Sequence, residues 1–125
     1  MPALTPELKE FLQRFFDSVE SIEIVALLQR SSTAFWTAEA VSQQLGIPVG
    51  IVTAKLDSMA PHVLVRGHQT GAYRYAPASD ETNRSVTELL QVYSEQRPTI
   101  INAIYSANLD RLRAFSDAFR LKKEP

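Results

Sequence analysis

Hydrophobic residues near the start of the chain follow a helical spacing. They recur every three or four positions: Leu8, Phe11, Leu12, Phe15, Phe16 and Val19. This spacing places them on one face of an α-helix. Thr5 and Pro6 precede the run, and they suit the cap and the first turn of a helix. The pattern predicts an amphipathic helix over about residues 6–17.

A denser apolar run follows and indicates a second, mostly buried helix. Its members are Ile22, Ile24, Val25, Ala26, Leu27 and Leu28. The run stops at the polar stretch 30–33, where short Ser and Thr side chains compete for backbone hydrogen bonds. The sequence therefore predicts a helix over about residues 19–29.

Two short helices joined by a tight turn are predicted next. Thr37 can cap the first helix, which ends near Gln44, and Gly46 can adopt the left-handed conformation that ends it. Pro48 fits the first turn of the second helix, which ends at residues 60–61. Residues spaced by three, four and three form its predicted buried face: Val49, Val52, Leu56 and Met59.

Segments 63–65 and 73–75 are typical of β-strands and flank the glycine-containing stretch 67–71. This arrangement predicts a β-hairpin with a five-residue connection. Tyr73 and Tyr75 alternate with Arg74, so we expect both rings on the inward face of the hairpin.

The C-terminal third is again helical in pattern. Apolar and long residues step alternately by four and three: Val86, Leu90, Tyr93, Arg97, Ile100, Ile104 and Ala107. Because this phase continues across Pro98, we expect one long helix over about 81–106 that is kinked at the proline, with a helix end there as the alternative. Residues 106–108 are predicted to interrupt it. A last helix from about 109 places Leu112, Phe115 and Phe119 on one side.

The predicted fold class is mainly α with a small β-hairpin, in one domain of residues 1–125. Segments 36–41, 45–47, 63–67 and 73–75, with Leu56, resemble the winged helix-turn-helix module over about residues 19–78. The flanking helices, 1–18 and 79–125, look similar to those of bacterial MarR-like and PadR-like regulators. This resemblance implies a DNA-binding transcriptional regulator whose terminal helices form a homodimer.

Composition narrows the function classes. At 45% hydrophobic and 22% charged, the 125 residues are typical of an ordinary globular domain. No cysteine and only two histidines leave little for metal binding or acid–base chemistry, so we expect no enzyme, no metal and no cofactor. The start of the sequence lacks a signal-peptide pattern and no apolar run reaches bilayer length, which predicts a cytoplasmic protein without a membrane partner.

Charge weakens the DNA-binding interpretation, because 13 basic residues stand against 14 acidic ones. The outward face of the predicted helix 49–59 carries no cation, and Asp57 on that face would repel phosphate. Phosphate contacts would have to come from its flank and the hairpin: Thr53, Lys55, Arg66, His68 and Arg74. The alternative is a protein-interaction module in which a partner helix approaches Gly50, Ala54 and Ser58 closely.

The apolar residues outside the winged-helix segment predict dimerisation, since five of the six phenylalanines lie there. The expected contact residues are Leu90, Tyr93, Ile100, Ile104, Phe115 and Phe119. Packing of the same stripe within one chain is the alternative.

Three further candidates have simple structural interpretations. His62 and His68 lack a third metal ligand, so we interpret them as surface side chains. Glu20 and Glu23 fit the first turn of a helix. Trp36 is interpreted as a core anchor, with a small-molecule pocket as the alternative.

Overall fold

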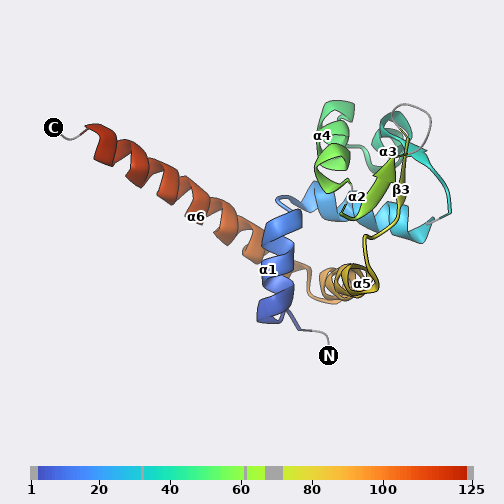
Figure 1. The fold of residues 1–125 in the computed structure, drawn as a ribbon, viewed down its shortest axis with the longest axis horizontal. Helices are drawn as coiled ribbons and strands as arrows, with labels where there is room; N and C mark the ends of the chain where they lie inside the picture. Colours follow the sequence, from blue (N-terminus) through green and yellow to red (C-terminus); the bar gives the residue numbers. More distant parts are fainter. Residues whose placement is uncertain (1–2, 32, 61, 67–71, 124–125) are drawn as a thin grey trace.

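The chain folds into helices and a small sheet (Figure 1). The computed structural model describes residues 3–31, 33–60, 62–66 and 72–123, without the side chains of 64–66 and 119–123. These residues form α1 (Pro6–Phe15), α2 (Val19–Arg30), β1 (Trp36–Thr37), α3 (Ala38–Leu45), α4 (Val49–Met59), β2 (Leu64–Arg66), β3 (Ala72–Tyr75), α5 (Asp80–Glu95) and α6 (Arg97–Lys123). The prediction of a mainly helical fold with a small β-hairpin is confirmed.

Short hydroxyl side chains begin four of the helices. Thr5, Ser18, Thr37 and Ser79 each accept a hydrogen bond from the backbone N–H three residues further on. Such caps satisfy N–H groups that have no partner inside the helix. Gly46 ends α3 with φ of 70°, as predicted, because the left-handed region is open to glycine.

The sheet has three antiparallel strands in the order β1–β3–β2. Val65 pairs with Arg74 in the predicted hairpin, and Trp36 pairs with Tyr73 through β1, a strand that the sequence pattern did not predict. Both hairpin tyrosines are buried, as expected. The predicted connection 67–71 lies outside the described residues.

One hydrophobic core joins the elements, with α2 at its centre. Helix α2 packs against α3, α4 and β3, while α1 packs against α5 and α6. Side chains from α1, α2, α4, α5 and α6 in this core are almost completely inaccessible: Leu12, Ile22, Leu28, Leu56, Leu89 and Ile100. Val49 was predicted in this core but is 44% exposed, because it begins α4 beyond the part that packs on α2.

The predicted kinked helix is wrong, because the structure contains two helices here. Helix α5 ends at Glu95. The next residue, Gln96, has φ of −135° and ψ of 58°, which are not helical, and α6 begins at Arg97. Pro98 is the second residue of α6. A backbone N–H at this position would have no hydrogen-bond partner inside the helix, so proline removes no helical bond there. The predicted interruption at 106–108 is also wrong, since α6 continues through it to Lys123.

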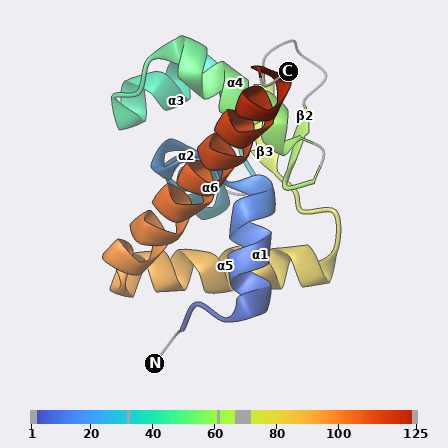
Figure 2. The ribbon, with the colours of Figure 1, turned by 90° about the vertical axis from the view of Figure 1, so that its left-hand side faces the viewer.

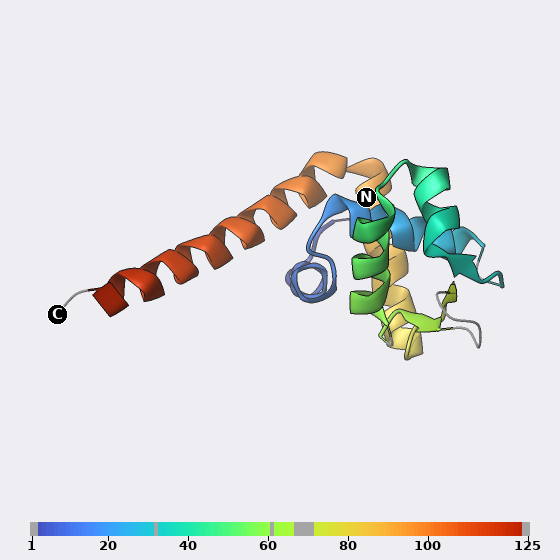
Figure 3. The same ribbon diagram turned by 90° about the horizontal axis from the view of Figure 1, so that it is seen from above.

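Two side chains attach α6 to the junction between α1 and α2. Asn108 Nδ2 donates to the backbone oxygen of Asp17 at 3.3 Å, and Arg111 Nη2 donates to that of Gln13 at 2.9 Å. Beyond this attachment α6 projects away from the rest of the molecule (Figures 1 and 3). Residues 111–118 are all exposed.

The stripe predicted for a partner helix is largely buried inside the chain. Tyr93, Ile100 and Ile104 are at most 7% exposed, and Leu90 packs partly buried on the core. Figure 2 shows α1 lying across α5, and α1 packs against both α5 and α6. Packing within one chain, the alternative, therefore holds for these residues. Phe115 is 69% exposed, and the Phe119 side chain lies outside the described part.

Among the helices of the described ranges, none combines the length and apolar character needed to cross a bilayer.

Candidate functional site

The outward face of α4 is the candidate interaction surface. Gly50, Ala54 and Ser58 are exposed there, as predicted, together with Thr53 and Ile51. The opposite side of the helix is fixed by Val52, Leu56 and Met59, none of which is accessible. The fold therefore holds this surface, hereafter the α4 face, in a defined shape.

Both charged side chains of α4 are bonded to other elements. Lys55 Nζ forms an ion pair with Asp17 Oδ1 at 3.0 Å, at the junction of α1 and α2. The carboxylate of Asp57 accepts a hydrogen bond from the hydroxyl of Tyr73 on β3. The Lys55 ammonium is consequently held against the body instead of extending from the α4 face.

The two hydroxyls on the α4 face are also bonded within the helix. Thr53 Oγ1 donates to the Val49 carbonyl at 2.9 Å, and Ser58 Oγ donates to the Lys55 carbonyl at 3.0 Å. Such local bonds are common for Ser and Thr inside helices. The α4 face thus consists of small and apolar side chains around the exposed Asp57, whose carboxylate is bonded to Tyr73.

The structure describes the side chains of two of the basic residues predicted to bind DNA, and these two contact different neighbours. Lys55 lies beside Asp17, whereas the Arg74 guanidinium stacks over the Phe35 ring at 5.1 Å from its centroid. The Arg66 side chain and His68 lie outside the described part of the chain. Phe35 is 48% exposed and was not among the predicted site residues.

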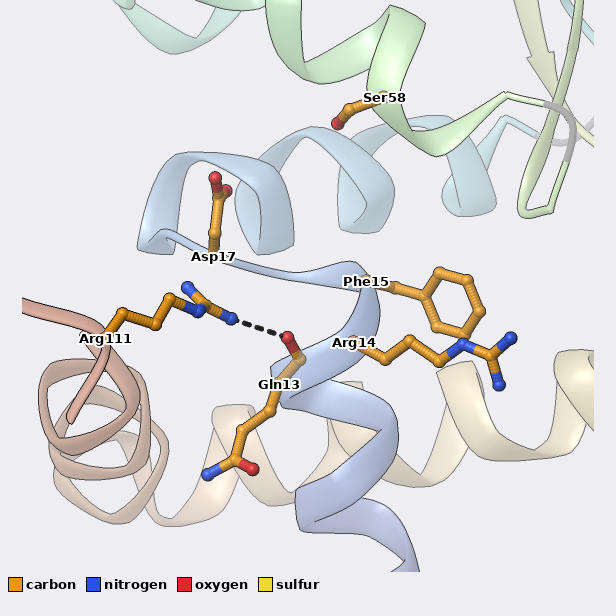
Figure 4. Close-up of a pocket in the computed structure, with 6 residues that line it drawn as sticks. All are labelled: Gln13, Arg14, Phe15, Asp17, Ser58 and Arg111. Atoms are coloured by element: carbon orange, nitrogen blue, oxygen red, sulfur yellow. Dashed lines mark hydrogen bonds between the residues drawn. The ribbon is translucent and has the colours of Figure 1, made fainter. Parts of the chain in front are cut away.

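A surface cleft of about 240 Å³ lies between α1, the end of α4 and α6. Figure 4 shows its lining residues: Gln13, Arg14, Phe15, Asp17, Ser58 and Arg111. The charged groups here have partners inside the chain, because Arg111 bonds Gln13 and Asn108, Asp17 binds Lys55, and Arg14 stacks on Phe15. The cleft therefore lies where α6 is attached to the rest of the chain.

Glu23 and Tyr93 form a partly buried contact between α2 and α5. The Tyr93 hydroxyl donates to Glu23 Oε1 at 2.7 Å. Burial, and then this hydrogen bond to a carboxylate, raise the pKa of Tyr93 to about 12. Glu20 lies in the first turn of α2, as expected, but the same prediction is wrong for Glu23, the fifth residue of the helix, whose carboxylate instead bonds α5.

The remaining candidates have structural roles. His62 is exposed and its ring lies 5.1 Å from that of Phe15. Trp36 packs partly buried against the core, as predicted. Within the described residues, no group of three His, Cys, Asp or Glu side chains is arranged to hold a metal ion.

Sequence analysis missed three residues that shape this region: Asp17, Asn108 and Arg111. Each acts on an element far away in the sequence, and local spacing gives no signal for such a contact. No protein-family model matches the sequence, and neither a curated protein nor a solved structure was found to be similar to it.

Proposed function

We propose that this chain is a winged-helix protein of the regulator type whose α4 face binds a helix of another protein. The order of elements supports the winged-helix assignment: α2, β1, α3, a glycine turn, α4 and the hairpin β2–β3. One observation carries the choice of partner. Every residue of α4 is described, and both of its charged side chains are bonded to other parts of the chain.

The composition of the α4 face fits a helix as partner. A helix packs closely where the opposing side chains are small, and Gly50, Ala54 and Ser58 step by four along α4. Ile51, 42% exposed, supplies apolar area beside them. DNA, in contrast, is bound mainly through cations that neutralise phosphates, and this face offers none.

Gly50 adds a second supporting observation. Its φ is not in the left-handed region, and a Cβ built there meets no atom within 4 Å. The chain's own packing therefore does not require glycine, although glycine inside a helix costs about 1 kcal/mol relative to alanine. A partner that approaches this position closely accounts for the residue.

Site-specific photo-crosslinking tests the proposal. A photoreactive phenylalanine analogue at Ala54 is expected to crosslink one protein in native lysate, through a helical segment located by mass spectrometry. The same analogue at Glu88, exposed on α5, is the matched control. Ala54→Glu in untagged competitor protein should abolish competition, because it introduces an unpaired charge into the contact. Equal crosslinking from Ala54 and Glu88, or competition that survives Ala54→Glu, contradicts the proposal.

DNA binding is the second candidate, and the start of α4 favours it. The cap residue is Pro48, which provides no side-chain hydrogen bond, so no side chain caps the N-terminus of α4. Backbone N–H groups at a helix N-terminus can bind phosphate, and the exposed Val49 and Ile51 can contact thymine methyl groups.

Fluorescence anisotropy with random duplex DNA over a salt series separates the two candidates. Under the protein-binding proposal, we expect no binding that depends steeply on salt. If DNA is the partner, Lys55→Ala, Arg66→Ala and Arg74→Ala should each weaken binding and lower the salt slope by about one phosphate. These three substitutions should leave a protein complex at α4 nearly unchanged.

A further inference from the structure

The cleft between α1, the end of α4 and α6 carries more positive than negative charge. The carboxylate in its lining belongs to Asp17, which is already paired with Lys55 at 3.0 Å. Arg14 and Arg111 also line the cleft, but their printed contacts are with neutral groups: the Arg14 guanidinium lies 5.2 Å from the centroid of the Phe15 ring, and Arg111 donates to two neutral oxygens. Within the described chain, two guanidinium groups at this cleft therefore have no carboxylate partner.

The guanidinium of Arg111 is held in position by the chain itself. Its Nη2 donates to the backbone oxygen of Gln13 and its Nη1 to Asn108 Oδ1, both at 2.9 Å. A guanidinium has five N–H donors, so further donors remain for an anion. Figure 4 shows the side chain reaching from α6 toward Gln13 on α1. A carboxylate can bind Arg111 without first ordering it, which lowers the entropic cost of binding.

Phe15 supplies an apolar wall beside these charges. Its ring is partly buried and lies 5.0 Å from the Phe11 ring and 5.1 Å from the His62 ring. In Figure 4, Arg111 enters from α6, whereas Arg14 extends past Phe15 away from α6. The order across the cleft is therefore cation, apolar ring, cation. This order fits a ligand with an anionic group at each end and an aliphatic part between them.

The size of the cleft limits the size of the ligand. Its volume is about 240 Å³. An engineered protein cavity of about 150 Å³ admits benzene, and by the same proportion this cleft admits about ten non-hydrogen atoms. Aliphatic dicarboxylates of about four to six carbon atoms are of this size.

We propose that this cleft binds a small aliphatic dicarboxylate. One carboxylate bonds Arg111, the carbon chain lies on the Phe15 ring, and the other carboxylate pairs with Arg14. The Asp17 carboxylate is nearby, and its ion pair with Lys55 offsets its repulsion of the ligand. Because the ligand contacts both α1 and α6, it stabilises the attachment of α6 to the body.

Succinate, glutarate and adipate are the probes for this site. In NMR titrations of the intact chain at constant ionic strength, at least one of them should bind with a Kd of about 1 mM or tighter and shift signals of residues 13–17 and 111. The corresponding neutral diamides should bind at least about tenfold more weakly, because they lack the charge-assisted hydrogen bonds. The proposal is overturned if no dicarboxylate binds with a Kd below about 10 mM, or if the diamides bind equally well.

Three substitutions assign the contacts. Arg111→Gln should weaken binding of the best probe by about tenfold or more. Arg14→Gln should weaken it by about threefold or more, and it keeps the hydrogen bond between α6 and Gln13. Arg113→Gln changes an exposed arginine of α6 that is not among the cleft residues, so this matched control should bind as the intact chain does. Unchanged binding by both cleft variants, or equal weakening by Arg113→Gln, overturns the proposal.

Amide hydrogen exchange tests the effect on α6. At about ten times its Kd, the probe should slow exchange over residues 104–111 by up to about tenfold, because opening of the attachment must first release the ligand. Exchange that stays the same while the probe binds contradicts its placement between α1 and α6. The inference does not depend on what α4 binds, since Ala54→Glu should bind the probe normally while it loses the α4 partner.

Discussion

The α4 face and the end of α6, residues 111–118, are both exposed, but the chain supports them differently. Behind the α4 face lie Val52, Leu56 and Met59, none of which is accessible. Residues 111–118 at the end of α6, in contrast, are all exposed. The α4 face is therefore shaped by packing on the core, whereas the end of α6 adds no buried side chain among residues 111–118.

The largest expected difference is in the free energy of unfolding lost when a leucine is removed from behind the α4 face or from the end of α6. Leu56→Ala removes a completely buried side chain and should lower the free energy of unfolding by about 2–5 kcal/mol. Leu112→Ala, at a site 60% exposed, should lower it by less than about 0.5 kcal/mol in dilute protein. Urea unfolding followed by circular dichroism measures both. Similar losses would show that the end of α6 is packed on the body.

Alkaline pH should lower the free energy of unfolding of the body that supports the α4 face. The pKa of Tyr93 is raised to about 12, so between about pH 10 and pH 12 the folded chain keeps a proton that an unfolded tyrosine releases. Stability contributed by this group is complete below pH 10 and is lost as pH rises toward 12, by on the order of 2 kcal/mol.

Tyr93→Phe isolates this contribution. The difference in unfolding free energy between the intact chain and the variant, measured in urea from pH 9 to pH 12, should shrink as pH rises. A difference that stays constant with pH would mean that Tyr93 releases its proton equally in both states.

A smaller effect is expected where α6 is attached to the body. Arg111→Ala removes the hydrogen bonds from the guanidinium to Gln13 and Asn108. Because these groups are exposed, the loss should be about 1 kcal/mol or less. Amide hydrogen exchange over residues 104–111 should accelerate up to about fivefold. Arg113→Ala on the next turn is the control, and equal acceleration by both variants would contradict a specific attachment.

The smallest expected change is a gain in stability. Gly50→Ala should raise the free energy of unfolding by about 0.4–1 kcal/mol, because the methyl group has space and alanine favours the helix. Thermal unfolding measures this gain. A loss would mean that the chain itself requires glycine, which would remove one support for a partner on the α4 face.

Local signals in the sequence were sufficient for the region around α3 and α4. Thr37, Gly46 and the spacing of Val52, Leu56 and Met59 act over a few residues, so the helices and the turn could be predicted. The outward position of Gly50, Ala54 and Ser58 followed from the same spacing.

Predictions failed where position along the chain or distant contacts decide the structure. Pro98 and Pro6 both lie in the first turn of a helix, yet Pro98 was interpreted as interior because the apolar phase continues across it. Strand β1 exists through its pairing with β3, in which Trp36 lies opposite Tyr73 from a distant part of the sequence. Two residues alone carry no periodicity that could predict such a strand. The ion pair of Lys55 with Asp17 likewise joins separate elements.

Trp36 is the only tryptophan in the sequence, and it lies half-buried where β1 pairs with β3. Helix α6 contains no tryptophan, and its exposed aromatic residue near the body is Tyr105. Tryptophan fluorescence therefore reports on the sheet and its surroundings, whereas ellipticity in the far ultraviolet also includes the long helix. Recorded together on one sample, the two optical signals distinguish fraying of α6 from unfolding of the body without any added dye.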